Sequence, residues 1–217
     1  MRSELFKRIL SSIILIPLVI IIIIKGSFYL NLFLTICFFI ILFEWHMMSK
    51  NKNYYFIGIF FLIGSFLSIY TLSNLNNSKL IFLFILLICV STDIGGYIFG
   101  NIFKGPKLTN ISPKKTYSGV LGGFLFSILF TFFFSNTNYF FLDKPGLSMK
   151  MLMLIILISS VSQLGDIVVS YFKRLSNIKD TGSIIPGHGG LLDRADGMIF
   201  AFPFSYIVLS TNLFKII

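Results

Sequence analysis

Long apolar runs, separated by short polar segments, dominate this chain. A helix needs roughly 17 to 25 mostly apolar residues to cross the hydrocarbon layer of a bilayer. We therefore expect an all-α, polytopic integral membrane helix bundle with about seven transmembrane helices. The predicted spans cover residues 8–25, 27–43, 54–72, 80–99, 119–135, 150–172 and 197–214. The second span follows the first so closely that a re-entrant hairpin is an alternative there.

The first run is preceded by basic residues, as in a signal peptide. It is long, contains Pro17 and ends in Lys25-Gly26 without a small-residue cleavage pattern. We therefore expect it to remain as an uncleaved span. The second span ends before Glu44-Trp45-His46, which we place at a membrane interface, with His46 as a simple anchor.

The distribution of basic residues predicts the orientation. With a cytoplasmic N-terminus, most of the 18 Lys and Arg lie in cytoplasmic segments, including the two long polar loops at 100–118 and 173–196. This bias is what the positive-inside rule describes. The formal net charge of +10 therefore reflects topology, and we reject nucleic acid as a partner.

Composition supports the membrane assignment, since 56% of residues are hydrophobic and only 12% are charged, against about a quarter charged in soluble domains. Cys37 and Cys89 both lie in apolar runs without a CxxC spacing, so neither a disulfide nor a zinc site is expected. By role, we divide the chain into a packing and dimer scaffold at 1–79 and a catalytic membrane domain at 80–217.

Two GxxxG spacings, Gly96 to Gly100 and Gly119 to Gly123, allow helices to approach closely. Packing between neighbouring spans is the favoured interpretation over a ligand role. The spacings are also compatible with a homodimer.

Polar residues concentrate between residues 163 and 197, where four of the eight acidic side chains lie. Asp166, Ser170 and Lys173 share one helix face by their i, i+4, i+7 spacing. A carboxylate inside a span persists only with a partner. Asp166 is therefore either one member of a structural ion pair or, as we favour, a metal ligand.

Asp193 and Asp196 flank Arg194 and share one face if residues 191–197 begin the last span. Such hard oxygen ligands suit Mg²⁺, which binds one or two carboxylates together with substrate phosphates. A helix N-cap is the alternative for Asp193. The turn at 186–190 has little side-chain bulk, so its amides could approach a phosphate. His188 has no second His nearby, which argues against zinc.

The other polar loop contains Ser112, Lys114, Lys115 and Thr116 just before a predicted span. Paired lysines and hydroxyls near a helix start suit an anionic phosphate. Ordinary cytoplasmic flanking charge is the alternative. Asp93 is a further intramembrane carboxylate, and we expect it in a polar cavity.

These residues together resemble the signature of the phosphatidate cytidylyltransferases, also called CDP-diacylglycerol synthases. The resemblance is carried by Ser170-Tyr-Phe-Lys-Arg-x4-Lys179-Asp180-x-Gly182-x3-Pro186-Gly-His-Gly-Gly-x-x-Asp193-Arg-x-Asp196. Support comes from Gln163-x-Gly165-Asp166, from Ser112-Pro-Lys-Lys-Thr116 with the glycines after it, and from Asp93-x-x-Gly96-Tyr97-x-x-Gly100. The resemblance covers residues 93–200.

It implies an enzyme that joins CTP and phosphatidate into CDP-diacylglycerol and pyrophosphate, with Mg²⁺ and room for a second cation, in a bacterial cytoplasmic (inner) membrane with the active site facing the cytoplasm. By motif, Asp166 and Asp193 would hold metal, supported by Asp196, and these three with Lys173 form the expected catalytic set. The expected substrate and phosphate contacts are Ser112, Lys114, Lys115, Thr116, Ser170, Arg174, Lys179, Asp180, His188, Gly189, Gly190 and Arg194.

The chain departs from the family pattern at Val169 and Ser118, where many members have Glu. These departures put a second cation site in question. Rival assignments are a polyprenol kinase or a CDP-archaeol synthase, which also use CTP. A cation-coupled transporter is a distant alternative, because it predicts inverted repeats and acids spread through the spans.

Overall fold

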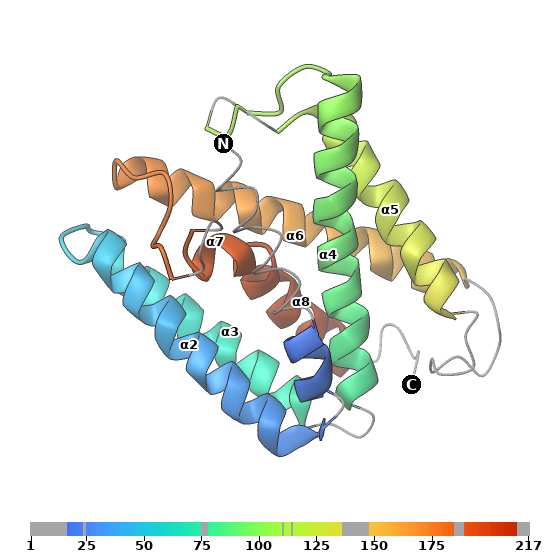
Figure 1. Ribbon diagram of the computed structural model, residues 1–217, viewed down its shortest axis with the longest axis horizontal. Helices are drawn as coiled ribbons and strands as arrows, with labels where there is room; N and C mark the ends of the chain where they lie inside the picture. The colour runs from blue at the N-terminus through green and yellow to red at the C-terminus, as the bar shows by residue number, and fades with distance from the viewer. Residues whose placement is uncertain are drawn as a thin grey trace. The chain divides into compact units, whose positions relative to one another are not determined.

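The computed structural model describes residues 17–23, 25–74, 78–109, 111–113, 115–135, 148–184 and 189–211. Within those ranges the chain forms helices joined by loops and contains no named strand, although an isolated antiparallel bridge pairs Lys107 with Thr116. The all-α prediction is confirmed. The helices, shown in Figure 1, are α2 (Ser27–Ser49), α3 (Tyr55–Ser73), α4 (Ser78–Phe103), α5 (Tyr117–Ser135), α6 (Met149–Leu175), α7 (Leu192–Ala195) and α8 (Met198–Ser210).

Five of these helices, α2 to α6, are long and apolar enough to cross a membrane, as expected of a polytopic membrane protein. They correspond to five of the seven predicted spans. Most of the predicted first span lies outside the described residues. In the part that is described, residues 17–23 are helical. The last predicted span corresponds to α8, which is apolar but has only 13 residues. The count of seven and the N-terminal orientation stay predictions.

Several helices continue beyond the apolar run that predicted them. α2 reaches Ser49 rather than ending at residue 43, so Glu44 and Trp45 lie inside the helix and are only 2% and 4% exposed. Both side chains are thus enclosed by protein, and their placement at the depth of a membrane interface stays a prediction. Similarly, α6 reaches Leu175 and contains Lys173 and Arg174 in its last turn. Hydropathy reports where apolar side chains end, whereas helical hydrogen bonding continues wherever packing and polar partners support it.

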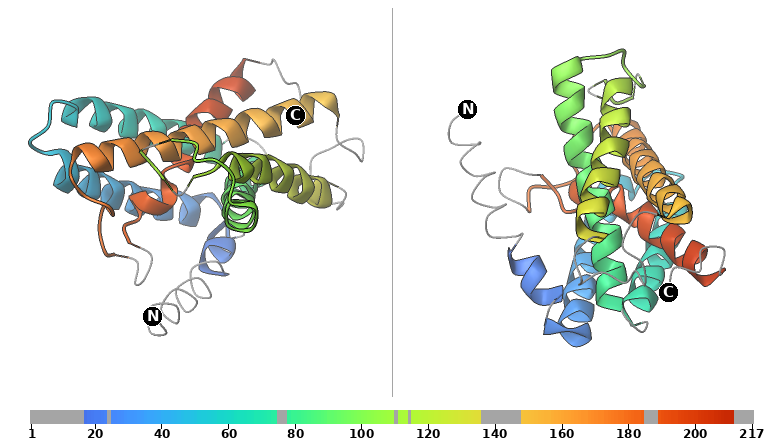
Figure 2. Two further views of the ribbon diagram at one scale, coloured as in Figure 1. Left: turned by 90° about the horizontal axis from the view of Figure 1, so that it is seen from above. Right: turned by 90° about the vertical axis from the view of Figure 1, so that its right-hand side faces the viewer.

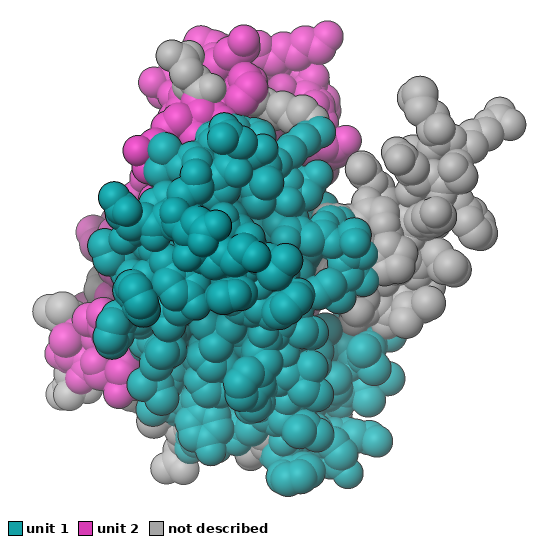
Figure 3. Space-filling view, turned by 90° about the vertical axis from the view of Figure 1, so that its left-hand side faces the viewer, with its two compact units in different colours: residues 1–79, 172–196 teal, residues 80–171, 197–217 magenta. Residues whose placement is uncertain are grey.

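The chain forms two compact units, which Figure 3 distinguishes by colour. Unit 1 contains residues 1–79 and 172–196, and unit 2 contains residues 80–171 and 197–217. Helix α6 belongs to both, because its last residues count with unit 1. Packing thus groups the segment 172–196 with the N-terminal helices. The predicted division at residues 79 and 80 was based on role and stays a prediction.

In unit 1, α2 and α3 pack side by side (Figure 1). Phe38 stacks on Phe66 with 4.3 Å between ring centroids. The indole of Trp45 meets Phe172 edge-on at 5.5 Å and donates its Nε1–H to the carbonyl oxygen of Tyr55 at 3.1 Å. Trp45 therefore anchors the end of α6 to the α2–α3 pair from inside the protein.

In unit 2, α4 and α5 lie side by side (Figure 2) through glycine contacts. A Cβ atom at Gly119 would lie only 2.9 Å from the carbonyl oxygen of Gly96, and one at Gly95 would collide with the backbone of Gly122. The prediction that the GxxxG spacings serve helix packing is confirmed. Cys37 and Cys89 are free thiols.

Candidate active site

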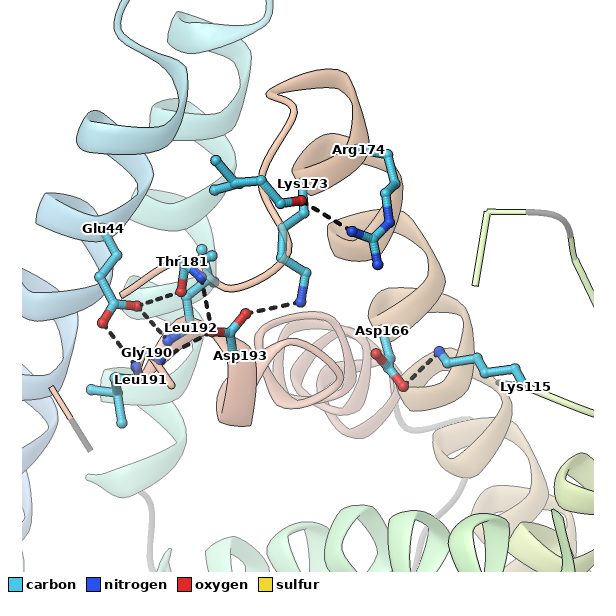
Figure 4. Close-up of polar contacts among 11 residues, drawn as sticks. Glu44, Lys115, Asp166, Lys173, Arg174, Thr181, Gly190, Leu191, Leu192 and Asp193 are labelled. Carbon is cyan, nitrogen blue, oxygen red and sulfur yellow. Dashed lines mark hydrogen bonds and ion pairs between the residues drawn. The ribbon is translucent and has the colours of Figure 1, made fainter. Parts of the chain in front are cut away.

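Unit 1 contains a buried ion pair between Lys173 and Asp193. Lys173, in the last turn of α6, is 8% exposed. Its Nζ donates a hydrogen bond to Oδ1 of Asp193, in the first turn of α7, at 2.9 Å (Figure 4). Both side chains are at most a tenth exposed. Two residues of the predicted catalytic set are thereby brought into contact.

The other oxygen of Asp193 organises the loop before α7. Oδ2 accepts the amide N–H of Thr181 at 2.9 Å and that of Gly190 at 3.0 Å. Burial by itself raises the pKa of Asp193, but the hydrogen bonds from Lys173, Thr181 and Gly190 outweigh it and lower this pKa below its ordinary value. Asp193 is therefore ionised at neutral pH.

The predicted alternative of an N-cap for Asp193 is wrong. The N-cap residue of α7 is Leu191, whose side chain makes no capping hydrogen bond. Asp193 instead lies within the first turn and reaches back to the preceding loop. The expected continuous start of the last span is also interrupted, because α7 ends at Ala195 and α8 begins at Met198. Asp196 follows α7 directly and is 9% exposed.

The two glycines before α7 fit a crowded turn. Gly189 has φ of 91°, a left-handed conformation that favours glycine. A Cβ at Gly190 would meet Thr181 Oγ1 and the Glu44 carboxylate. The Gly190 amide, predicted to approach a phosphate, is instead directed at Asp193. His188 lies outside the described residues.

The remaining charged candidates of unit 1 are exposed. Arg174 is exposed and donates through Nη1 to the carbonyl oxygen of Ile178 at 3.2 Å. Lys179, Asp180 and Arg194 are also exposed. In its described part, the segment 172–196 therefore carries three exposed cations, Arg174, Lys179 and Arg194.

A second ion pair, in unit 2, joins the loop before α5 to helix α6. Nζ of Lys115 lies 2.5 Å from Oδ2 of Asp166, with both side chains less than a third exposed (Figure 4). An ion pair was one of the two alternatives for Asp166. Thr116 Oγ1 accepts the amide of Gly119 at 3.1 Å and so supports the start of α5. Ser112 accepts the Lys115 amide through its carbonyl at 3.0 Å, and Lys114 lies outside the described residues.

The remaining positions singled out in the sequence lie on α4, α5 and α6. Asp93 lies on α4 and is exposed, and its assignment to a cavity stays a prediction. Ser170 is half-buried on α6. Val169 is 2% exposed, so this position is apolar and packed. Ser118 Oγ accepts the amide of Gly105 at 3.3 Å and lies 3.0 Å from Thr116 Oγ1, where it ties the loop to α5.

The sequence reasoning missed Glu44. Its carboxylate accepts hydrogen bonds from Thr181 Oγ1 at 2.9 Å and from the amides of Leu191 and Leu192 at 2.8 Å each. The signal that could have found it is an ionisable residue at the end of a long apolar run, which is costly unless it is partnered.

The described residues contain no group of three or more His, Cys, Asp or Glu side chains placed to hold a metal ion. Mg²⁺ does not need such a group, because it commonly uses one or two carboxylates together with phosphates and waters. Among the described residues, Oδ2 of Asp193 accepts two amides, whereas Oδ1 accepts a single donor. Asp166 uses Oδ2 for Lys115. Each carboxylate thus fits a cation through one oxygen.

Comparison with known proteins gives a consistent result. Residues 52–212 match the model of the cytidylyltransferase family. A Rickettsia bellii protein named phosphatidate cytidylyltransferase is 38% identical over 214 residues, covering 95% of this chain and 91% of the relative. A Rickettsia typhi protein of that name is 35% identical, covering 93% and 90%. A Staphylococcus epidermidis protein of that name is 44% identical over 128 residues, covering 58% and 48%.

Proposed function

The chain belongs to the cytidylyltransferase family, and from that premise we propose that it transfers the cytidylyl group of CTP to phosphatidate, giving CDP-diacylglycerol and pyrophosphate. The observation that carries this proposal is the similarity, over 95% of the chain, to a relative named phosphatidate cytidylyltransferase. Five apolar helices suit an enzyme whose lipid substrate resides in a bilayer. The proposed location is the bacterial inner membrane, with the site facing the cytoplasm.

The reaction is a displacement at phosphorus. An oxygen of the phosphatidate phosphate attacks the α-phosphorus of CTP, and the bond from that phosphorus to the oxygen bridging it to the β-phosphorus breaks. Pyrophosphate leaves with the electron pair of this bond. The attacking phosphate is already anionic at neutral pH, so it needs little help from a general base. The protein must bring two polyanions together and align them, which is a task for cations and for positioning.

We propose that the exposed cations of unit 1, Arg174, Lys179 and Arg194, bind substrate phosphates. Lys173 would add a buried positive charge, held in a fixed position by Asp193. Lys115, with Lys114, Ser112 and Thr116, would contribute a second group of phosphate contacts. The further proposed contacts are Ser170, Asp180, His188 and Gly189, whereas the Gly190 amide is already engaged by Asp193.

Mg²⁺, when bound, would neutralise phosphate charge and make the α-phosphorus more electrophilic. Asp193 and Asp166 are the proposed ligands, each through a single oxygen, with Asp196 in support. Asp193→Asn should remove nearly all turnover while the protein still folds and inserts, because an amide is a poor ligand for Mg²⁺ and cannot balance Lys173. Near-normal activity of the purified, folded variant would contradict the metal role.

The proposed reaction is tested by supplying the purified protein, in detergent, with phosphatidate and CTP labelled at either the α- or the γ-phosphate. The α-label should enter the lipid phase only when phosphatidate and Mg²⁺ are present. Transfer of the γ-label would instead indicate a lipid kinase. Transfer only to an unsaturated ether-lipid acceptor, and not to phosphatidate, would indicate a CDP-archaeol synthase.

A further inference from the structure

Glu44 is a buried acidic side chain to which neither the signature residues nor the proposed reaction gives a role. It lies near the end of α2 and is 2% exposed. Oε2 accepts hydrogen bonds from Thr181 Oγ1 and from the amide of Leu192, and Oε1 accepts the amide of Leu191, all within 2.9 Å (Figure 4). A carboxylate with three charge-assisted hydrogen bonds is strongly fixed in place.

Glu44 and Asp193 together hold both ends of the segment between Thr181 and Leu192. Thr181 gives its amide to Asp193 and its hydroxyl to Glu44. The three consecutive amides before and within the first turn of α7 are likewise divided, since Gly190 donates to Asp193 while Leu191 and Leu192 donate to Glu44. The two carboxylates therefore act on the same short stretch of backbone.

The fit around Glu44 is close. A Cβ at Gly182 would lie 3.0 Å from Oε1, and one at Gly190 would lie 2.6 Å from Oε2. Both neighbours are glycines, which allows the backbone to approach the carboxylate. The contact therefore depends on the carboxylate and on small residues opposite it.

α7 needs such a partner because it has no cap of its own. The first amides of a helix have no partner within the helix, and a side chain at the N-cap usually satisfies one of them. The N-cap of α7 is Leu191, which cannot do this. Glu44 supplies the missing acceptors from a different helix, about 150 residues away along the chain.

We propose that Glu44 is a positioning residue: from α2, it fixes Thr181 and the start of α7, and thereby sets the Asp193 carboxylate against Lys173. Its consequence for catalysis rests on the proposed function, whereas the structural part does not. Glu44 does not bind substrate in this proposal. A displacement of about 1 Å at a reacting group can lower turnover by about 100-fold. Loss of the Glu44 contacts, called the anchor below, should therefore lower kcat.

Glu44→Gln is the most informative variant because it removes the charge and preserves side-chain volume. Gln has one acceptor oxygen, and its NH₂ group would face a backbone N–H donor. The matched control is Ser49→Ala, a buried polar residue on the same helix whose Oγ donates to the carbonyl oxygen of Trp45 within α2. Both variants and the parent chain are purified in detergent and checked for a single monodisperse species.

Two measurements are made on each protein. Amide hydrogen exchange, measured without substrate, reports on the peptides that contain Thr181 and the Gly190–Leu192 stretch, with α3 as an internal reference. Steady-state transfer of the α-label reports kcat and KM for CTP. In Glu44→Gln we expect exchange at the anchored peptides to rise at least about 10-fold while α3 keeps its protection. We expect kcat to fall about 10- to 100-fold, with KM changed far less, and Ser49→Ala to resemble the parent.

Thr181 provides a second pair of variants. Thr181→Val removes the hydroxyl that donates to Glu44 but keeps the amide that donates to Asp193. Thr181→Ser keeps both donors. Thr181→Ser should therefore retain clearly more turnover than Thr181→Val. The double variant of Thr181→Val with Glu44→Gln should lower kcat by less than the product of the two single fold-losses. Both changes remove the same hydrogen bond.

Three results would overturn the proposal. Unchanged exchange in Glu44→Gln would mean that the anchor is unimportant. Equally raised exchange in α3 would mean that Glu44 supports the whole unit rather than this segment. Local loosening with unchanged kcat would mean that the segment does not position reacting groups. Absence of label transfer by the parent chain would contradict the proposed function instead, and the exchange comparison would still judge the anchor.

Discussion

The ammonium group of Lys173 lies 2.9 Å from Oδ1 of Asp193, a contact between the end of α6 and the start of α7. Both side chains are at most a tenth exposed. A buried charge left without its partner is costly, whereas removal of both charges can be nearly neutral. The contact therefore has measurable consequences for stability that do not depend on substrate.

Replacing Lys173 with Met should destabilise the protein by about 3 kcal/mol, because Asp193 would remain buried without its cation. The double variant Lys173→Met with Asp193→Asn should recover part of that loss. Thermal unfolding in detergent measures both effects, and Lys179→Met, at an exposed lysine, serves as the control and should change little. A double variant whose loss equals the sum of the two single losses would contradict the pairing.

Stability should fall in acid because of Asp193. The hydrogen bonds from Lys173, Thr181 and Gly190 outweigh the opposing effect of burial and hold its folded-state pKa below the ordinary value of 3.8. The unfolded chain therefore takes up a proton at this site first as pH falls. The stabilisation from Asp193 is fully present above the unfolded pKa and is lost as pH falls through the folded pKa. Thermal midpoints recorded from pH 6 downward should show a decline that is shallower in Asp193→Asn. Parallel curves for the two proteins would argue against the lowered pKa.

Gly190→Ala should disrupt the segment before α7. The new Cβ would be forced against Thr181 Oγ1 and the Glu44 carboxylate, which are themselves fixed by hydrogen bonds. We expect a loss of about 1–3 kcal/mol, typical of overpacking, together with reduced label transfer. Gly64→Ala is the matched control, since a Cβ there meets nothing within 4 Å and lies within α3. Equal stability of the two variants in unfolding experiments would show that the segment before α7 shifts to accommodate the added Cβ.

Lys115→Met should separate an ion-pair role from simple flanking charge. Lys115 is paired with Asp166, whereas Lys107 lies in the same polar loop with an exposed side chain. If Lys115 orients Asp166 and contacts phosphate, its loss should reduce kcat/KM for CTP at least about 10-fold, while Lys107→Met remains near the parent. Similar small losses in both variants would favour the flanking-charge alternative. Both proteins should be compared at equal levels of insertion.

The sequence by itself determined the all-α class, five of the membrane helices and the packing use of the GxxxG spacings. These features depend on local quantities, namely the length of apolar runs and the absence of a Cβ where α4 meets α5, and so they are visible in the order of residues. The signature between Ser170 and Asp196 likewise identified the family, because its spacing is specific. The membership follows from the family match over residues 52–212.

Only the tertiary structure decided the ends of α2 and α6, the split between the two units and the role of Glu44. A single acid at the end of an apolar run indicates that a partner exists but not which one, because the partners Thr181, Leu191 and Leu192 are distant in sequence. Likewise, the spacing of Asp193 placed it at a helix start, yet its oxygens could have bound its own helix, a metal ion or a lysine. The choice of Lys173 and two loop amides follows from how the chain folds back on α2, which no local pattern records.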